Sequence, residues 1–327
     1  MAGTGDRGAG PVPRDLPSAL LQHLARASAH PASPLLAPLV ESLRERFGDA
    51  LQAVLLYGST LHNDDPTDGL VDLYAVVDAY GRAYPGGFLR LCNRLLPPNV
   101  FYLQRDTPEG VTVRCKYAVV SMEHLRRGTS RWFHPYLWAR FAQPVRLLYA
   151  RGLDAEGRIH DALARAVLTF LRETAASLGP GAVTSSEIWK EGLERTYASE
   201  LRPERDRARH LVERYAEEYR VRTAAAAPAL PSFLEPAGDD LYRPLGGAAL
   251  RRRQARRWAL RRWQGKLLSV LRLAKAVFTF ENGADYIAWK VERHTGVPIE
   301  VTPRLRRHPI LFSPPVLWRL LRARAIR

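Results

Sequence analysis

Apolar and polar positions divide the first half of the chain into short runs separated by turns. Residues 34–47 carry apolar side chains at helical spacing, which predicts a helix that ends at Gly48. Residues 51–57 are apolar nearly throughout, a pattern that is typical of a strand covered on both faces. A polar, turn-rich segment at 60–69 leads into a second apolar run at 70–78. The pattern therefore predicts a helix, a strand, a loop and a second strand.

Further runs of the same kind extend this predicted unit to residue 152. They predict a helix at 84–96, strands at 100–104 and 111–120, a helix at 132–141 and a short strand at 144–149. Residues 34–152 are therefore expected to form one domain with a mixed sheet. The preceding residues 1–33 are rich in Gly, Pro and Ala, and we expect a flexible tail there.

From about residue 157 the apolar positions follow a helical period. They predict a long helix from there, helices at 187–197 and 206–222, a basic helical region at 251–280, a helix around 284–294 and a terminal amphipathic helix after Pro315. An Ala/Pro-rich run at 223–236 is predicted to be a loop or linker. The predicted class is α+β: the sheet domain, a helical domain at 153–236, and a basic helical C-terminal region at 237–327.

Composition places the chain among globular proteins of a reducing compartment. Of its 327 residues, 46% are hydrophobic and 25% are charged. The two cysteines, Cys92 and Cys115, argue against a disulfide framework. No uncharged apolar run reaches 18 residues, and the first residues lack the apolar core of a secretory signal. We therefore expect a cytoplasmic protein without a transmembrane helix.

The net charge of +16 is concentrated at one end of the chain. Residues 241–327 contain 20 Lys/Arg and four Asp/Glu, which leaves 29 of each in residues 1–240. A segment of this kind attracts a polyanion, either nucleic acid or an anionic membrane surface.

The segment 54–78 carries the clearest chemistry. A strand that ends at Gly58-Ser59, followed by Asp72 on a second strand, is the layout of the nucleotidyltransferase superfamily. Glycine allows the backbone to approach a triphosphate, serine offers a hydroxyl and an N–H to its oxygens, and the aspartate is suited to hold Mg²⁺. A plain strand–turn–strand with a buried aspartate is the alternative.

The second acid of the usual pattern is missing, because Tyr74 stands two residues after Asp72. Asp78 shares the strand face but lies ~20 Å along it, too far to share one ion. It is either a strand-end residue near the nucleotide or a structural cap. The second metal ligand is expected from the helical domain, from the substrate phosphates or from the acids of the loop, which are Asp64, Asp65 and Asp68.

With one acid in place of two, YGS…VDLYAVVD resembles the mitochondrial phosphatidate cytidylyltransferases, known as translocator assembly and maintenance proteins, and their bacterial relatives. KYAVVS from Lys116, YLWARFAQPV at 136–145, GL at 192–193 with YASELR at 197–202, and LRLAKAVFT at 271–279 are similar to later motifs of that family, in the same order. Three positions depart from the family pattern: Thr60 and Ala276 replace glycines, and Glu200 replaces an aspartate. These changes raise the possibility of an altered substrate or reduced activity.

The resemblance implies a nucleotidyltransferase-like fold and a Mg²⁺-dependent enzyme that makes CDP-diacylglycerol and pyrophosphate from CTP and phosphatidic acid. It implies catalytic roles for Asp72, Lys116 and Glu200, with Asp72 also the metal ligand. The implied nucleotide contacts are Tyr57, Gly58, Ser59, Thr60 and Asp78. The implied contacts to lipid or phosphate are Tyr197, Arg202 and Lys275. A solvated strand face is the alternative reading of Lys116.

The basic region fits a lipid substrate, because its tryptophans are interleaved with arginines as at membrane interfaces. These tryptophans are Trp258, Trp263, Trp289 and Trp318. We expect peripheral binding to the inner face of the cell membrane, in part through the terminal helix. Packing of Trp258 and Trp263 in the core is an equally good reading, and nucleic acid is a less favoured partner.

Three functional hypotheses follow. The first is phosphatidate cytidylyltransferase activity at a membrane surface. The second keeps the nucleotidyltransferase fold but transfers to RNA, a protein or a small molecule. The third is a relative that has lost catalysis and only binds nucleotide or membrane.

Overall fold

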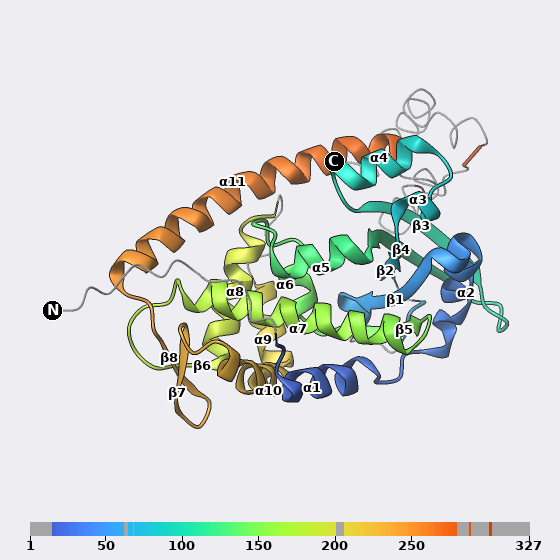
Figure 1. Ribbon diagram of the computed structural model, residues 1–327. Coiled ribbons are helices and arrows are strands. Elements are labelled where there is room, and N and C mark those ends of the chain that lie inside the picture. Colours follow the sequence, from blue (N-terminus) through green and yellow to red (C-terminus); the bar gives the residue numbers. More distant parts are fainter. Residues whose placement is uncertain are drawn as a thin grey trace, which may run out of the picture.

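The computed structural model describes residues 15–61, 65–67, 69–200, 206–279, 288 and 301–302 (Figure 1). A five-stranded mixed sheet near the N-terminus is followed by a mostly helical region, which confirms the predicted α+β class. The helix predicted around 284–294, apart from position 288, and the terminal helix after Pro315 lie outside the described residues.

The sheet contains all the strands that the apolar pattern predicts. They are β1 (Leu51–Tyr57), β2 (Val71–Val77), β3 (Asn99–Asp106), β4 (Thr112–Ser121) and β5 (Arg146–Ala150). The strand order is β3-β4-β2-β1-β5, in which β2 and β4 pair parallel and the other neighbours pair antiparallel. The parallel register sets Asp72 opposite Lys116, and the β1–β2 register sets Tyr57 opposite Asp72.

Helices cover both faces of the sheet, which explains why β1 and β2 read as continuous apolar runs. Helix α2 (Ala37–Phe47) packs on one face, where Val54 belongs to its hydrophobic cluster. Helices α5 (Met122–Ser130), α6 (Trp138–Ala142) and α7 (Leu153–Ala175) pack on the other, where Leu55 lies. Because side chains alternate along a strand, Asp72 and Lys116 both lie on this second face, next to Tyr74 and Ala118.

The remaining elements surround this frame. Between β2 and β3 lie α3 (Tyr80–Ala83) and α4 (Gly87–Leu95). After α7 come β6 (Val183–Thr184), α8 (Ser185–Tyr197), α9 (Arg207–Arg214), α10 (Ala216–Ala226), β7 (Leu234–Gly238), β8 (Leu241–Pro244) and α11 (Ala248–Thr279). Strands β6, β8 and β7 form a second, three-stranded sheet.

Two predicted irregular segments are in fact ordered parts of the core. Residues 1–33 include helix α1 (Ser18–Ser28), whose Leu20 and Leu24 are buried in the core beside α7, so the prediction of a loose tail is wrong there. The prediction of a loop or linker at 223–236 is wrong as well, because this segment is ordered. It contains the end of α10, a short 3-10 turn and the start of β7, with Leu230 and Leu234 buried.

Helix α11 is the longest element, about 48 Å for its 32 residues, and runs along one side of the molecule (Figure 1). One buried carboxylate on α7 fixes it: Arg261 Nη2 lies 2.7 Å from Glu173 Oε2, and Arg257 Nη2 lies 3.5 Å from the same oxygen. Arg172 pairs with the other oxygen at 3.0 Å. Trp258 is also fully buried, with the Arg261 guanidinium 4.6 Å from its ring centroid.

Replacing Glu173 with Gln keeps the side-chain shape but leaves the buried guanidinium of Arg261 without a counter-charge. We expect the free energy of unfolding to fall by about 3 kcal/mol, measured by urea unfolding at neutral pH. Asp154→Asn removes a carboxylate that is 86% exposed and is expected to change stability by less than about 0.5 kcal/mol. Equal losses in the two variants would contradict this assignment.

The same ion pairs predict a dependence on pH. Burial alone would raise the pKa of Glu173, but Arg261, Arg172 and Arg257 outweigh it and hold the pKa below the ordinary value of 4.5. A depressed carboxylate pKa stabilises the fold above the unfolded pKa, and this stabilisation is lost as pH falls through the folded pKa. As the pH is lowered below 4.5, the free energy of unfolding should therefore fall more steeply in the wild type than in Glu173→Gln, as measured by urea unfolding at each pH.

Candidate active site

A cavity of about 1540 Å³ lies where the sheet meets the helical region. On the sheet side it is lined by the end of β1, the beginning of β2, and by β3 and β4. On the helical side it is lined by α6 and the segment before it, by α8 and the turn after it, by α9, and by the flank of α11. Tyr57, Gly58, Asp72 and Lys116 line the sheet side, as the sequence predicts. The lining residues range from Tyr57 to Leu273, so the cavity depends on the tertiary fold.

Gly58 lies close to Asp72, in a backbone conformation that is strained for any other residue. The glycine has φ +84°, in the left-handed region, and a Cβ built there would lie 2.9 Å from Asp72 Oδ2. The absence of a side chain therefore lets the turn after β1 lie directly against the carboxylate. This turn continues as a short 3-10 segment, residues Ser59–Leu61.

Asp72 and Lys116 form the charged pair at the sheet edge of the cavity. Lys116 Nζ lies 3.5 Å from Asp72 Oδ1, and the side chains are 34% and 24% exposed. Both groups therefore reach the cavity while remaining within range of each other. The solvated strand face that was the alternative for Lys116 does not describe this position.

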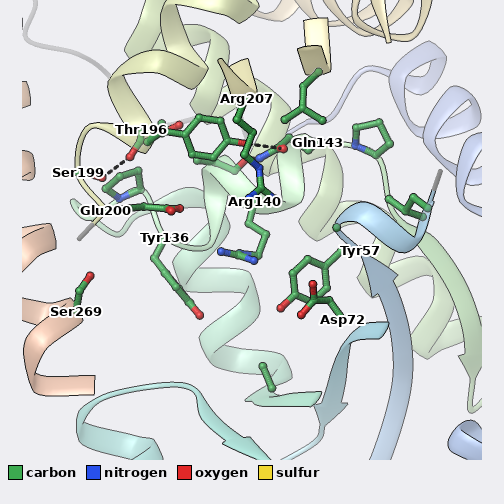
Figure 2. A pocket seen from close by; sticks show the side chains of 18 of the residues that line it. Tyr57, Asp72, Tyr136, Arg140, Gln143, Thr196, Ser199, Glu200, Arg207 and Ser269 are labelled. Atoms are coloured by element: carbon green, nitrogen blue, oxygen red, sulfur yellow. Dashed lines mark hydrogen bonds between the residues drawn. The ribbon is translucent and has the colours of Figure 1, made fainter. Parts of the chain in front are cut away.

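Arg140 is the main site residue that sequence reasoning missed. It projects from α6 into the middle of the cavity, between Asp72 on one side and Glu200 on the other (Figure 2). Its guanidinium carbon lies 4.9 Å from the ring centroid of Tyr57 and 5.2 Å from that of Tyr136, and its Nε is buried without a hydrogen-bond partner. The signal was present, because Arg140 falls in the segment 136–145 that contributed to the family resemblance.

Arg140 keeps its positive charge although its side chain is half-buried. Burial alone would lower its pKa, but the acidic groups of Tyr74, Tyr57, Tyr136 and Glu200 hold the pKa above its ordinary value. Arg140 is therefore a permanent cation with donor capacity that faces the cavity. An anion entering the cavity would meet a preformed positive group and would not have to wait for one to be protonated.

The helical wall contributes a second set of polar groups. The Tyr197 hydroxyl donates to Gln143 Oε1 at 3.2 Å, and the Arg207 guanidinium lies 5.5 Å from the Tyr197 ring centroid. Glu200 follows in the turn after α8, where its N–H donates to the carbonyl of Tyr197 at 2.9 Å. Tyr197 and Glu200 thus line the cavity, as the sequence predicts. Glu200 lies across the cavity from Asp72 (Figure 2).

His134 is a neutral polar group at the α11 side of the cavity. Burial lowers its pKa to about 3, and Arg272 and Arg261 add to the effect. Its Nδ1 accepts the N–H of Tyr136 at 3.2 Å, so the proton of the neutral ring is on Nε2, which is buried without a partner. Sequence reasoning gave no indication of this residue.

Two expected site residues have structural roles. Lys275 Nζ donates to the carbonyls of Leu96 and Pro98 at 2.6 and 2.7 Å and to Asn99 Oδ1 at 3.0 Å, which ties α11 to the segment after α4. Asp78 lies at the far end of β2, where it accepts from the N–H of Ala79 and pairs with Arg82. Neither residue lines the cavity. These contacts favour the structural alternative for Asp78 and a structural role for Lys275.

The remaining predicted positions are Thr60, Ser59, Arg202 and the three loop acids. The Thr60 hydroxyl contacts the carbonyl of Leu70 at 3.5 Å and does not line the cavity. Arg202 and the side chain of Ser59 lie outside what the structure describes. Among the loop acids, Asp65 accepts from the N–H and hydroxyl of Thr67, whereas Asp64 and Asp68 are not described.

The donor set fits a magnesium ion that is completed by a substrate. Mg²⁺ usually takes one or two carboxylates and fills the remaining positions with phosphate oxygens and water. Asp72 supplies a partly exposed carboxylate beside the turn at Gly58. In the described part of the chain no group of three His, Cys, Asp or Glu side chains is placed to hold a metal by itself.

A scan against protein-family models gave no match to this chain, and a search of curated proteins found no similar protein. The family resemblance therefore rests on the motifs and on the way the cavity assembles them.

The position of Arg140 predicts that it binds a phosphate chain. We expect Arg140→Met to weaken binding of inorganic triphosphate about tenfold to 100-fold, measured by isothermal titration calorimetry with Mg²⁺ present. Arg140→Lys, which keeps the charge, should recover part of the affinity. Arg131→Met, which removes an exposed arginine outside the cavity, is the matched control. Unchanged affinity in a folded Arg140→Met would contradict the assignment.

Proposed function

We propose that this protein is a phosphatidate cytidylyltransferase, which transfers CMP from CTP to phosphatidic acid and releases pyrophosphate. One observation supports this most directly. Gly58, Asp72 and Lys116, which carry the family resemblance at the sheet, line the same cavity as Tyr197 and Glu200, which carry it in the helical region. Motifs that are far apart in the sequence thus contribute to one site.

The reaction needs positioning and charge neutralisation more than a general base. The phosphate of phosphatidic acid is already ionised, and one of its oxygens forms a bond to the α-phosphorus of CTP. The bond from that phosphorus to the bridging oxygen breaks, and pyrophosphate leaves with the electron pair. The protein therefore has to hold two polyanions together while negative charge moves toward the leaving group.

The residues of the sheet edge suit the nucleotide. The turn at Gly58 allows the backbone to approach the phosphates, and Lys116 neutralises charge on the phosphoryl group that is transferred. Asp72 would hold Mg²⁺, which supplies further neutralisation of the phosphate oxygens when it is bound. Lys116, 3.5 Å from Asp72, keeps that carboxylate oriented.

The opposite wall suits the second substrate. Arg140 lies between the sheet edge and Glu200, so it can contact phosphates from either side of the cavity. The hydroxyl of Tyr197 is held by Gln143. Tyr197 and Glu200 would then position the lipid headgroup together with the cations that neutralise it. Arg140 is the residue that we add to the set expected from the sequence.

Docking on a membrane is part of this proposal. In the described residues no helix is long and apolar enough to cross a bilayer. A lipid substrate would then be reached by peripheral binding to the inner face of the cell membrane, which the cationic C-terminal region favours.

A different acceptor is the second candidate. A cavity of about 1540 Å³ exceeds what a nucleoside triphosphate alone requires, and it would also accept an RNA end, a protein side chain or a small molecule. A relative that has lost catalysis is the third. The Asp72–Lys116 pair beside Gly58 argues against loss.

Labelled CTP, Mg²⁺ and phosphatidic acid vesicles test the proposal. The wild type should produce lipid-extractable label, and Asp72→Asn should lower the rate by about 100-fold or more. Asp154→Asn, an exposed carboxylate on α7, is the matched control and should retain full activity. If label enters RNA or protein but never lipid, the second candidate replaces the first. If no acceptor is labelled, catalysis itself is excluded.

A further inference from the structure

The outward face of α11 is apolar along most of its second half. Its exposed side chains are Leu260, Trp263, Leu267, Val270, Leu271 and Phe278, between 43% and 75% exposed. Spacings of three and four residues place them on one side of the helix. Trp258, Arg261 and Gly265 are buried on the inward side. The helix therefore presents hydrophobic side chains to the solvent and several polar ones to the protein, the reverse of an ordinary surface helix.

Helix α4 has a second stripe of the same kind and packs against α11 (Figure 1). Phe88, Leu91 and Leu95 are 58%, 55% and 73% exposed and share one side of α4. The bonds from Lys275 to the carbonyls of Leu96 and Pro98 hold the end of α4 against α11. We call the stripes of α4 and α11 together the apolar face.

Exposed apolar groups of this size and continuity usually mark an interaction site. The charge around the apolar face indicates the partner. Residues 248–279 contain eight arginines and two lysines and no acid, and α4 contains Arg90 and Arg94 and no acid. Exposed cations flank the stripes, among them Arg90, Arg94, Arg256 and Lys266.

A second copy of this chain is a poor partner for this face, because like would meet like: cations would stand opposite cations with no carboxylate between them. The chain's own C-terminal residues 280–327 are a poor partner for a related reason, since they carry nine Lys/Arg against four Asp/Glu. An anionic lipid surface complements both parts of this face. Its acyl chains can take up the apolar side chains, and its negatively charged headgroups can pair with the flanking cations.

The cavity opens beside this face. Ser269 and Leu273 line the cavity from the flank of α11, and Leu273 is 64% exposed. We propose that the apolar face of α4 and α11 docks on an anionic bilayer and so brings the cavity mouth to the headgroup layer. The link to a lipid substrate rests on the proposed function, whereas docking itself does not.

Vesicle flotation of the full chain without CTP tests the docking. We use phosphatidylcholine vesicles with and without phosphatidylglycerol. The wild type should float with the anionic vesicles and far less with the neutral ones. Trp263→Ser combined with Leu267→Ser, and separately Phe88→Ser combined with Leu91→Ser, should each weaken binding about tenfold or more. Leu153→Ser, at a position 87% exposed on α7, is the matched control.

Charge reversal supplies a second arm. Arg90→Glu combined with Lys266→Glu should weaken binding to the anionic vesicles, whereas Lys190→Glu on α8, also exposed, should leave it unchanged. Wild-type binding by the α11 double variant would overturn the proposal, and wild-type binding by the α4 variant would remove α4 from the face. A wild-type dimer that these substitutions dissociate would show a protein interface instead and would also overturn it.

Docking and catalysis fail separately in these experiments. Asp72→Asn should float as the wild type does, because it lies inside the cavity. The apolar-face variants should lose activity on vesicles but keep it on phosphatidic acid dispersed in detergent. Normal flotation without any cytidylyl transfer would refute the proposed function and leave the docking surface intact.

Discussion

The carboxylate of Glu173 holds α11 in place, and much of the molecule depends on that attachment. With Arg261 2.7 Å away and both side chains buried, the pair is sealed from solvent. Such a pair contributes little net stability compared with apolar packing, but removal of one partner is costly. The arrangement therefore fixes where α11 lies more than how stable the protein is. The Glu173–Arg261 pair therefore also sets the position of Ser269, which lines the cavity, and of the exposed apolar side chains around Trp263.

Helix α11 shows what composition alone leaves out about the basic region. Its positive charge predicted a surface that attracts polyanions, but several of its cations serve the interior. Arg261 lies against Trp258, the Arg272 guanidinium lies 4.1 Å from the ring centroid of Tyr136, and all three donors of Lys275 have acceptors. Only the outward arginines and lysines are therefore available to a partner. The same side of α11 also carries its exposed apolar side chains.

The sequence predicted the sheet well because each strand is an apolar run bounded by turn residues, and those signals are local. It failed at α1 and at 223–236, where alanine- and proline-rich stretches resemble linkers but are packed against α7 and α8. At the site, the turn at Gly58 and the carboxylate of Asp72 were recognisable from their motif. The contact of Asp72 with Lys116 results from the parallel β2–β4 register, which no local pattern encodes. Arg140 was missed, and Asp78 and Lys275 were left open, for the same reason: packing between distant segments decides which side chains reach the cavity.

The close approach of Gly58 to Asp72 also limits how the protein can diverge. A side chain at position 58 would adopt a strained backbone conformation and would displace the carboxylate at 72, so a change at the first position disturbs the second. A side chain at position 58 is therefore expected to occur together with a change at position 72. Position 60, whose threonine turns away to the carbonyl of Leu70, is free of this restriction.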